Sequence, residues 1–274
     1  MTKHDENQDE ISYTGERLVI NDQIKQLHPL CLEQHLQRYI FASDYVKGKN
    51  ILDAACGSGY GTKILYDAGA LTCTGIDISN ESVKYAQKTY GSNNISYTLG
   101  DVNKLSFNDG SFDVIVSFET IEHINNGQTW IKESARLLNE NGLFIISTPN
   151  RSITNPGAYF NDKPTNPYHM FEYNTLEFIG ELLCEYDIMN LYGQALVDGF
   201  KRERSHKFFT YRTFIKKILP QTIKSMSHKF RVNNIIPDQK NDLVPFSDIK
   251  NLQPTFIIAV CKKKHINNEN FKSL

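Results

Sequence analysis

The sequence predicts an α/β fold in which helices cover both faces of a mostly parallel sheet. Short apolar segments alternate with segments of helical apolar spacing between residues 49 and 193. One of them, Phe112–Phe118, is apolar on both faces, as a central parallel strand should be. Five strand–helix units at this spacing predict a right-handed, doubly wound sheet.

The expected elements follow one another closely along the chain. The expected strands are one beginning at Ile51, then Thr72–Ile78, Ile95–Leu99, Phe112–Phe118, Leu143–Ser147, Asp187–Tyr192 and Thr255–Cys261. The expected helices are Thr62–Gly69, Glu81–Tyr90, Trp130–Leu138 and Thr175–Glu185, after an N-terminal helix within Leu30–Val46.

Length and composition limit the classes of protein that the chain can belong to. Its 274 residues, 40% of them hydrophobic, suit one large domain or a domain with one insertion. A net charge of −1 excludes binding of polyanions by overall charge alone. No segment approaches the roughly 18 apolar residues of a membrane span. The five cysteines include no Cys-x-x-Cys pair, which favours reduced thiols in a cytoplasmic protein over disulfides or a zinc site.

A glycine-rich turn follows the first expected strand. The segment Ile51–Gly61 contains the pattern Asp53-x-x-x-Gly57-x-Gly59-x-Gly61. Glycine suits backbone that has positive φ or that contacts a ligand, and a strand–turn–helix corner of this kind binds nucleotides. The spacing differs from the dinucleotide pattern Gly-x-Gly-x-x-Gly. A carboxylate at the strand tip suits a cationic amino group better than a pyrophosphate.

This corner resembles motif I of the class I S-adenosylmethionine-dependent methyltransferases, and the resemblance extends over most of residues 13–193. It implies a Rossmann-like, seven-stranded sheet with an antiparallel last strand, and S-adenosylmethionine as the cofactor. Asp77 would then accept both ribose hydroxyls, because one carboxylate supplies two acceptor oxygens in a plane. Asp101 would accept a hydrogen bond from the adenine amino group. The expected cofactor residues are Tyr13, Arg17, Arg38, Asp53, Ala54, Cys56, Gly57, Gly59, Tyr60, Asp77, Ile78, Asp101, Val102 and Phe118.

Residues ahead of the sheet are expected to form a lid over the cofactor. In methyltransferases with a similar leader, an N-terminal helix covers the cofactor. Arg38 could pair with the methionine carboxylate through two parallel hydrogen bonds, and Tyr13 and Tyr39 would be aromatic residues of the lid. A packing helix over the sheet edge is the alternative for this segment.

Acidic and imidazole side chains follow the fourth and fifth strands. Glu119, Glu122 and His123 would share one face of a helical turn, and His169 lies in the loop after the fifth strand. Three interpretations compete. His123 or His169 could act as a general base on an acceptor hydroxyl. All four residues could instead bind a divalent cation, Mg²⁺ or Mn²⁺, that activates the hydroxyl. Finally, the glutamates could only orient the cofactor and cap the helix.

The identity of the acceptor stays open at this level. The set Glu-x-x-Glu-His with a later histidine resembles metal-assisted 2′-O-methyltransferases of RNA 3′ ends, and Glu-x-x-Glu-His also occurs in ubiquinone-type O-methyltransferases. The leader and Asn166-Pro-Tyr-His169 are similar to methyltransferases of bacterial surface-glycan pathways. We therefore expect O-methylation of a sugar or phosphorylated sugar-like precursor for capsule or O-antigen type polysaccharide. RNA methylation and a catalytically idle binding subunit are the alternatives.

A basic insertion is expected before the last strand. Residues 201–231 carry ten Lys and Arg residues against Glu203 alone, which suits a solvated helical segment or a surface for phosphate or a partner. The expected division of the chain is a disordered tail (1–12), lid helices (13–48), the methyltransferase core (49–193), the insertion (194–253), the last core strand (254–264) and a second tail (265–274). The oligomeric state does not follow from the sequence.

Overall fold

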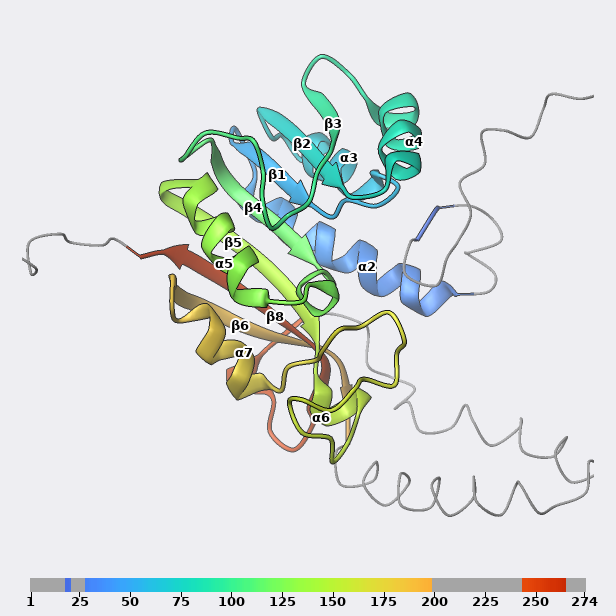
Figure 1. Cartoon of the computed structure of the whole chain (residues 1–274), viewed down its shortest axis with the longest axis vertical. Coiled ribbons are helices and arrows are strands. Elements are labelled where there is room, and N and C mark those ends of the chain that lie inside the picture. Colours follow the sequence, from blue (N-terminus) through green and yellow to red (C-terminus); the bar gives the residue numbers. More distant parts are fainter. Residues whose placement is uncertain (1–17, 21–27, 199–242, 265–274) are drawn as a thin grey trace, which may run out of the picture.

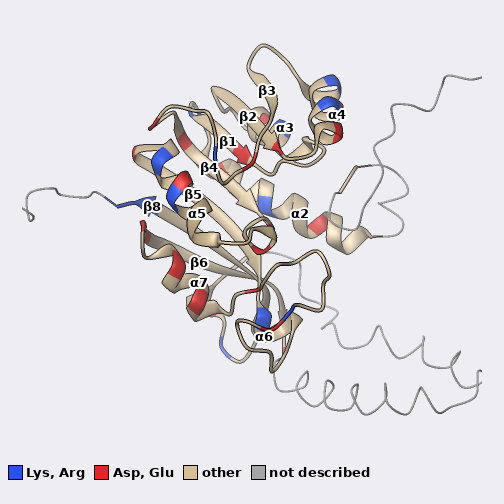
Figure 2. Ribbon diagram, in the orientation of Figure 1, with Lys and Arg blue, Asp and Glu red and all other residues tan. Residues whose placement is uncertain are grey.

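The computed structural model describes residues 18–20, 28–198 and 243–264, and these ranges form one α/β unit (Figure 1). Tyr13, Arg17, the two tails and most of the basic insertion lie outside the described residues. Among the residues that are described, Lys and Arg are scattered over several elements (Figure 2). Within the same ranges, no helix combines the length and the hydropathy that crossing a membrane requires.

The sheet has eight strands in the order β3-β2-β1-β4-β5-β8-β6-β7. The first five are parallel, and β8 runs antiparallel between β5 and β6, as expected for the last strand. The expectation of seven strands was wrong by one. The additional strand is β7, whose two residues pair with Tyr192 and Gly193 on the outer side of β6. The strands are β1 (Asn50–Ala54), β2 (Thr72–Asp77), β3 (Ile95–Leu99), β4 (Phe112–Phe118), β5 (Leu138–Pro149), β6 (Tyr186–Val197), β7 (Val244–Pro245) and β8 (Gln253–Lys263).

Helices cover both faces of the sheet, as the sequence predicts. Successive residues of a strand point to opposite faces, so Ile51 and Leu52 of β1 belong to different cores. The Ile51 side packs against three helices and the Leu52 side against two others. The first group is α2 (Pro29–Ala42), α3 (Tyr60–Asp67) and α4 (Asn80–Tyr90), and the second is α5 (Gly127–Leu137) and α7 (Thr175–Leu182).

Local signals explain where several helices begin. Asn174 and Glu177 form a capping box at the start of α7, in which each side chain bonds to the backbone N–H of the other. Ser79 caps α4 and Asn126 caps α5 through their side-chain oxygens. The helix α2 lies beside the arrowheads of β1 and β4 (Figure 1), so it reaches the carboxyl edge of the sheet, where ligands of doubly wound folds bind.

Candidate active site

The glycine-rich turn connects β1 to α3 with backbone in the left-handed region. Ala55 has a φ of 58°, Gly57 of 55° and Gly59 of 86°. The turn is fixed against β2, because the Cys56 N–H donates to the Ile76 carbonyl over 2.8 Å. An L-residue with a side chain is unfavourable at such φ values, which explains why glycine occupies two of the three positions.

The three glycines of the motif have different surroundings. A Cβ at Gly59 would lie 2.5 Å from the Ala86 Cβ, and one at Gly61 would lie 2.0–2.4 Å from the Tyr39 ring. These two positions need glycine so that α4 and α2 can pack closely. A Cβ at Gly57 would have no heavy atom of the described ranges within 4 Å. Of the three, only Gly57 therefore faces open space into which a ligand can approach the backbone.

Acidic and apolar side chains flank this open space at the tips of β2 and β3. Asp77 accepts the Gly57 N–H over 2.9 Å and the Ser79 N–H over 2.8 Å, one on each carboxylate oxygen. Each oxygen keeps a second lone pair for a hydroxyl. Ile78 is 76% exposed, and the hydrogen bonds of Asp101 to Asn103 use only Oδ1. An apolar surface between two carboxylates fits a purine ring with its ribose, so this part of the expected cofactor set suits S-adenosylmethionine.

The remaining expected cofactor residues are buried around the turn. Ala54, Cys56, Tyr60, Val102 and Phe118 are each less than 9% exposed. Phe118 and Tyr60 pack edge-on against the Tyr39 ring, at centroid distances of 5.1 and 5.7 Å. These two side chains therefore support α2 through Tyr39. The backbone of Val102, next to Asp101, stays at the sheet edge where adenine is expected.

Asp53 lies under α2 and is fully buried. Its two oxygens accept the Tyr39 hydroxyl over 3.1 Å and the Thr62 hydroxyl over 2.6 Å. The pKa of this carboxyl is raised to about 7, because burial and, to a smaller extent, the charge of Asp77 outweigh the hydrogen bonds from Thr62 and Tyr39, which lower it. The structure thus places two neutral donors on the carboxyl that the sequence assigned to a cationic amino group.

The raised pKa of Asp53 predicts a pH-dependent stability. The folded state holds this proton more tightly than the unfolded chain does, so the contribution of Asp53 is complete below an unfolded pKa of about 4 and is lost as the pH rises towards 7. Asp53→Asn has no such proton to lose, so we expect its free energy of unfolding not to fall over that pH interval. Relative to the wild type, the variant should gain up to about 4 kcal/mol between about pH 4 and about pH 7. Urea unfolding of both proteins at several pH values measures the difference, and parallel pH profiles would contradict the prediction.

A second group of polar residues follows β4 and β5. Glu119 has a left-handed φ of 48°, and its carboxylate accepts the Ser147 hydroxyl over 2.6 Å. The short helix η2 begins only at Ile121 and ends at His123. The prediction that Glu119 shares a helical face with Glu122 and His123 is therefore wrong. The positive φ of Glu119 turns the chain before the helix starts.

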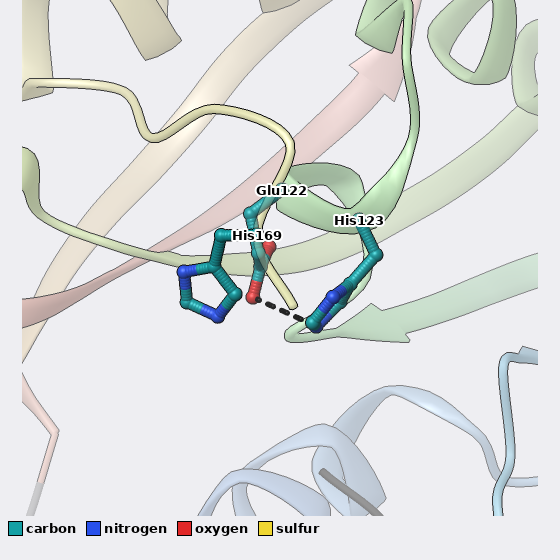
Figure 3. Close-up of side chains that lie close together, drawn as sticks. All are labelled: Glu122, His123 and His169. Atoms are coloured by element: carbon teal, nitrogen blue, oxygen red, sulfur yellow. Dashed lines mark ion pairs between the residues drawn. The ribbon is translucent and has the colours of Figure 1, made fainter. Parts of the chain in front are cut away.

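Glu122, His123 and His169 meet beyond the ends of β4 and β5 (Figure 3). One ligand atom from each of the three lies within 4.8 Å of the others. Glu122 is fully buried and accepts the Thr148 hydroxyl over 3.1 Å, and its Oε1 lies 4.0 Å from His123 Nε2. The Tyr168 carbonyl lies 3.0 Å from His123 Nδ1, so Nδ1 carries the proton and Nε2 is the accepting nitrogen of the neutral ring.

His169 is held by its own loop. Its Nδ1 donates to Glu172 over 2.7 Å, and Asn166 donates to its Nε2 over 2.9 Å. Burial acts to raise the pKa of Glu172, but hydrogen bonds from His169, Thr154 and Asn155 lower it overall. These two contacts place a proton of His169 on Nδ1, and the Asn166 amide must turn away before Nε2 can bind anything else.

The sequence identified most of these side chains but missed their partners. Ser147, Thr148 and Glu172 orient Glu119, Glu122 and His169, and Gln194 of β6 bonds to Arg38. Thr148 and Glu172 stand in short local motifs, Thr148-Pro-Asn and His169-x-x-Glu172, so the sequence held a signal for both. Gln194 carried none, because it lies 156 residues from Arg38.

The fold, the open glycine turn and the acidic strand tips together define a class of protein. Residues 52–146 match the family of methyltransferase domains. Over these residues the chain is similar to S-adenosylmethionine-dependent methyltransferases, the description that its curated relatives also carry.

The curated relatives match about half of the chain. A "probable S-adenosylmethionine-dependent methyltransferase" of Mycolicibacterium smegmatis is 36% identical over 136 residues, which cover 50% of each protein. A ubiquinone biosynthesis O-methyltransferase of Coxiella burnetii is 33% identical over 118 residues, or 42% of this chain and 50% of the relative. The chain thus spans about half the length of these relatives.

Solved structures show the same fold at low sequence identity. An S-adenosylmethionine-dependent methyltransferase from Mesorhizobium loti superposes with a TM-score of 0.54 at 15% identity, covering 84% of this chain and 99% of the other. The [4+2]-cyclase SpnF superposes with a TM-score of 0.53 at 14% identity, covering 84% of this chain and 80% of the other. The fold alone therefore does not determine the chemistry, which has to be argued from the site.

Proposed function

We propose that the protein is an S-adenosylmethionine-dependent methyltransferase that methylates a hydroxyl oxygen. The observation that carries the proposal is the position of His123, whose Nδ1–H is held by the Tyr168 carbonyl at the carboxyl edge of the sheet. A hydroxyl is a weak nucleophile because its pKa lies far above neutrality, so it needs a base in contact with it. An imidazole with a fixed tautomer supplies one.

Different residues of the site bind the cofactor and activate the acceptor for an in-line displacement at the methyl group. Bound S-adenosylmethionine supplies a methyl group on a sulfonium. The open backbone at Gly57, the Asp77 carboxylate and the Ile78 side chain hold the nucleoside. As the hydroxyl oxygen displaces sulfur from the methyl carbon, His123 Nε2 takes the proton of the hydroxyl, and Glu122, 4.0 Å away, stabilises the imidazolium.

A divalent cation is the second candidate for activating the hydroxyl. Glu122, His123 and His169 would hold it, because their ligand atoms lie within 4.8 Å of one another. The cation would lower the pKa of a bound hydroxyl. Glu119, the fourth ligand expected from the sequence, bonds to Ser147 and lies 3.9 Å from Arg38, so it would have to turn to join the other three.

We propose a sugar or phosphorylated sugar-like precursor as the acceptor. The support is the resemblance of the leader and of residues 166–169 to glycan-pathway methyltransferases. Oxygen as the methylated atom is further supported by the O-methyltransferase among the relatives.

The test is a methyl-transfer assay with the purified full chain. S-adenosylhomocysteine formation is measured with nucleotide-linked sugars, lipid-linked sugars, a catechol and an RNA 3′ end, each with and without EDTA. We expect turnover with a sugar acceptor. Turnover that survives EDTA supports the histidine base, and turnover that Mg²⁺ or Mn²⁺ restores supports the cation. Methylation of RNA alone would overturn the proposed acceptor.

A further inference from the structure

Arg38 of α2 is a buried cation whose hydrogen-bonding capacity is only partly used. The residue is fully buried, and its Nη1 donates to the Gln194 side chain over 2.8 Å. Its Nε is also buried and has no hydrogen-bond partner among the residues that the structure describes. Burying a guanidinium donor without an acceptor is unfavourable. A buried donor of this kind in a native fold indicates that a bound ligand supplies the acceptor.

The described neighbours of Arg38 neutralise its charge only in part. The Glu119 carboxylate lies 3.9 Å from Nη1, which is too long for a hydrogen bond. The Phe256 ring lies 4.9 Å from the guanidinium carbon, which gives a cation–π contact. Burial first, and then the charge of Arg38, lower the pKa of His35. A guanidinium in this setting binds carboxylates and phosphates well.

The neighbours of Arg38 also place it within the site. Gln194 on β6 pairs with Phe256 on β8, which in turn pairs with Pro149 at the carboxyl end of β5. In the sheet order these strands lie on one side of β4, and β1, β2 and β3 lie on the other side. The seat of the nucleoside, between Gly57 and Asp77, belongs to β1 and β2. Arg38 therefore reaches the half of the sheet edge that lies away from the nucleoside.

We propose that Arg38 binds an acidic group of the methyl acceptor, a carboxylate or a phosphate, and so selects acidic acceptors. The proposal rests on the methyl transfer proposed above and replaces the methionine carboxylate, expected from the sequence, as the partner of Arg38. Without an acceptor, Glu119 partly balances the charge of Arg38. An acidic acceptor then competes with Glu119 for the guanidinium, and the Nε–H becomes available as a second donor for a bidentate contact.

This arrangement predicts opposite effects for two substitutions. Arg38→Met removes the cation and should weaken the binding of an anion. Glu119→Gln removes the competing carboxylate and keeps an oxygen for the Ser147 hydroxyl, so it should strengthen the binding of the same anion. If Arg38 only supported the packing of α2, the two substitutions would not be expected to change the anion affinity in opposite directions.

The experiment is a calorimetric titration of the full-length protein and its variants with inorganic phosphate, acetate and S-adenosylhomocysteine. We expect Arg38→Met to weaken phosphate or acetate binding by about tenfold or more, as loss of a charged hydrogen bond does, and to change the S-adenosylhomocysteine affinity by less than about twofold. Arg38→Lys keeps the charge and should restore part of the affinity. The stronger of the two anions identifies a phosphate or a carboxylate as the group bound. Arg136→Lys, on the distant α5, is the control for an arginine outside the site.

Either of two results would overturn the proposal. One is a tenfold loss of S-adenosylhomocysteine affinity in Arg38→Met, which would show that Arg38 binds the cofactor and not the acceptor. The other is an equal affinity of the wild type and Arg38→Met for both anions. Failure of methyl transfer in the wild type would count against the proposed function alone, because anion binding is measured without turnover.

Discussion

Replacing His123 with Asn is expected to lower kcat by about 100- to 10,000-fold, the usual contribution of a general base. The substitution is matched to the structure. The Asn amide can occupy the place of Nδ1 and donate to the Tyr168 carbonyl, so the loop that carries His169 keeps its contact. What is lost is Nε2, the nitrogen that takes the proton. Stopped assays for S-adenosylhomocysteine under saturating acceptor measure kcat.

His169→Asn is the comparison variant for this experiment. It keeps a donor to Glu172 in place of Nδ1 and removes Nε2. If His123 is the base, His169→Asn should cost much less activity than His123→Asn. If a cation is held by Glu122 and both histidines, the two variants should lose similar activity and added Mn²⁺ should partly compensate both. A His123→Asn enzyme with wild-type kcat would exclude both mechanisms.

Replacing Gly61 with Ala is expected to lower the free energy of unfolding by about 3 kcal/mol, as overpacking does. The added Cβ would lie 2.0–2.4 Å from three atoms of the Tyr39 ring, so the ring must move. Movement of the ring also breaks the hydrogen bond from the Tyr39 hydroxyl to Asp53 and disturbs the edge contacts with Tyr60 and Phe118. Urea unfolding followed by circular dichroism measures the loss.

The same substitution at Gly180 is the matched control. Gly180 also lies within a helix, but within the described part of the chain a Cβ there would meet no heavy atom closer than 4 Å. Gly180→Ala should therefore stabilise the protein by about 0.5–1 kcal/mol through helix propensity. A Tyr39→Ala background should remove most of the penalty at Gly61. Equal effects at Gly61 and Gly180 would show that Tyr39 does not determine the third glycine of the motif.

The fold could be predicted from the sequence because its signals are local. The apolar strands, the helical spacing and the turn at Gly57 can each be recognised within a few neighbouring residues. Right-handed connections then limit the possible orders of the parallel strands. The eighth strand could not be predicted, since β7 has only two residues and exists through its pairing with β6. The insertion that was expected there lies mostly outside the described residues.

The site could be predicted only in part, for a related physical reason. The residues that carry the chemistry, such as Asp77 and His123, stand in short motifs. Their surroundings come from contacts between distant parts of the chain. The pairing of Arg38 with Gln194 spans 156 residues, and the left-handed φ of Glu119 turns it away from Glu122. No local pattern distinguishes Gly61, which makes room for Tyr39, from Gly57, which faces open space.

The central claim is that the open backbone at Gly57 seats the nucleoside of the cofactor. Its most direct test is a titration of the wild type and Gly57→Asn with S-adenosylhomocysteine. Asn tolerates a left-handed φ, so this variant should keep its fold while its side chain fills the open space. We expect the wild type to bind and Gly57→Asn to bind at least about tenfold more weakly, which corresponds to about 1.4 kcal/mol. Equal affinities, or no binding by the wild type, would contradict it.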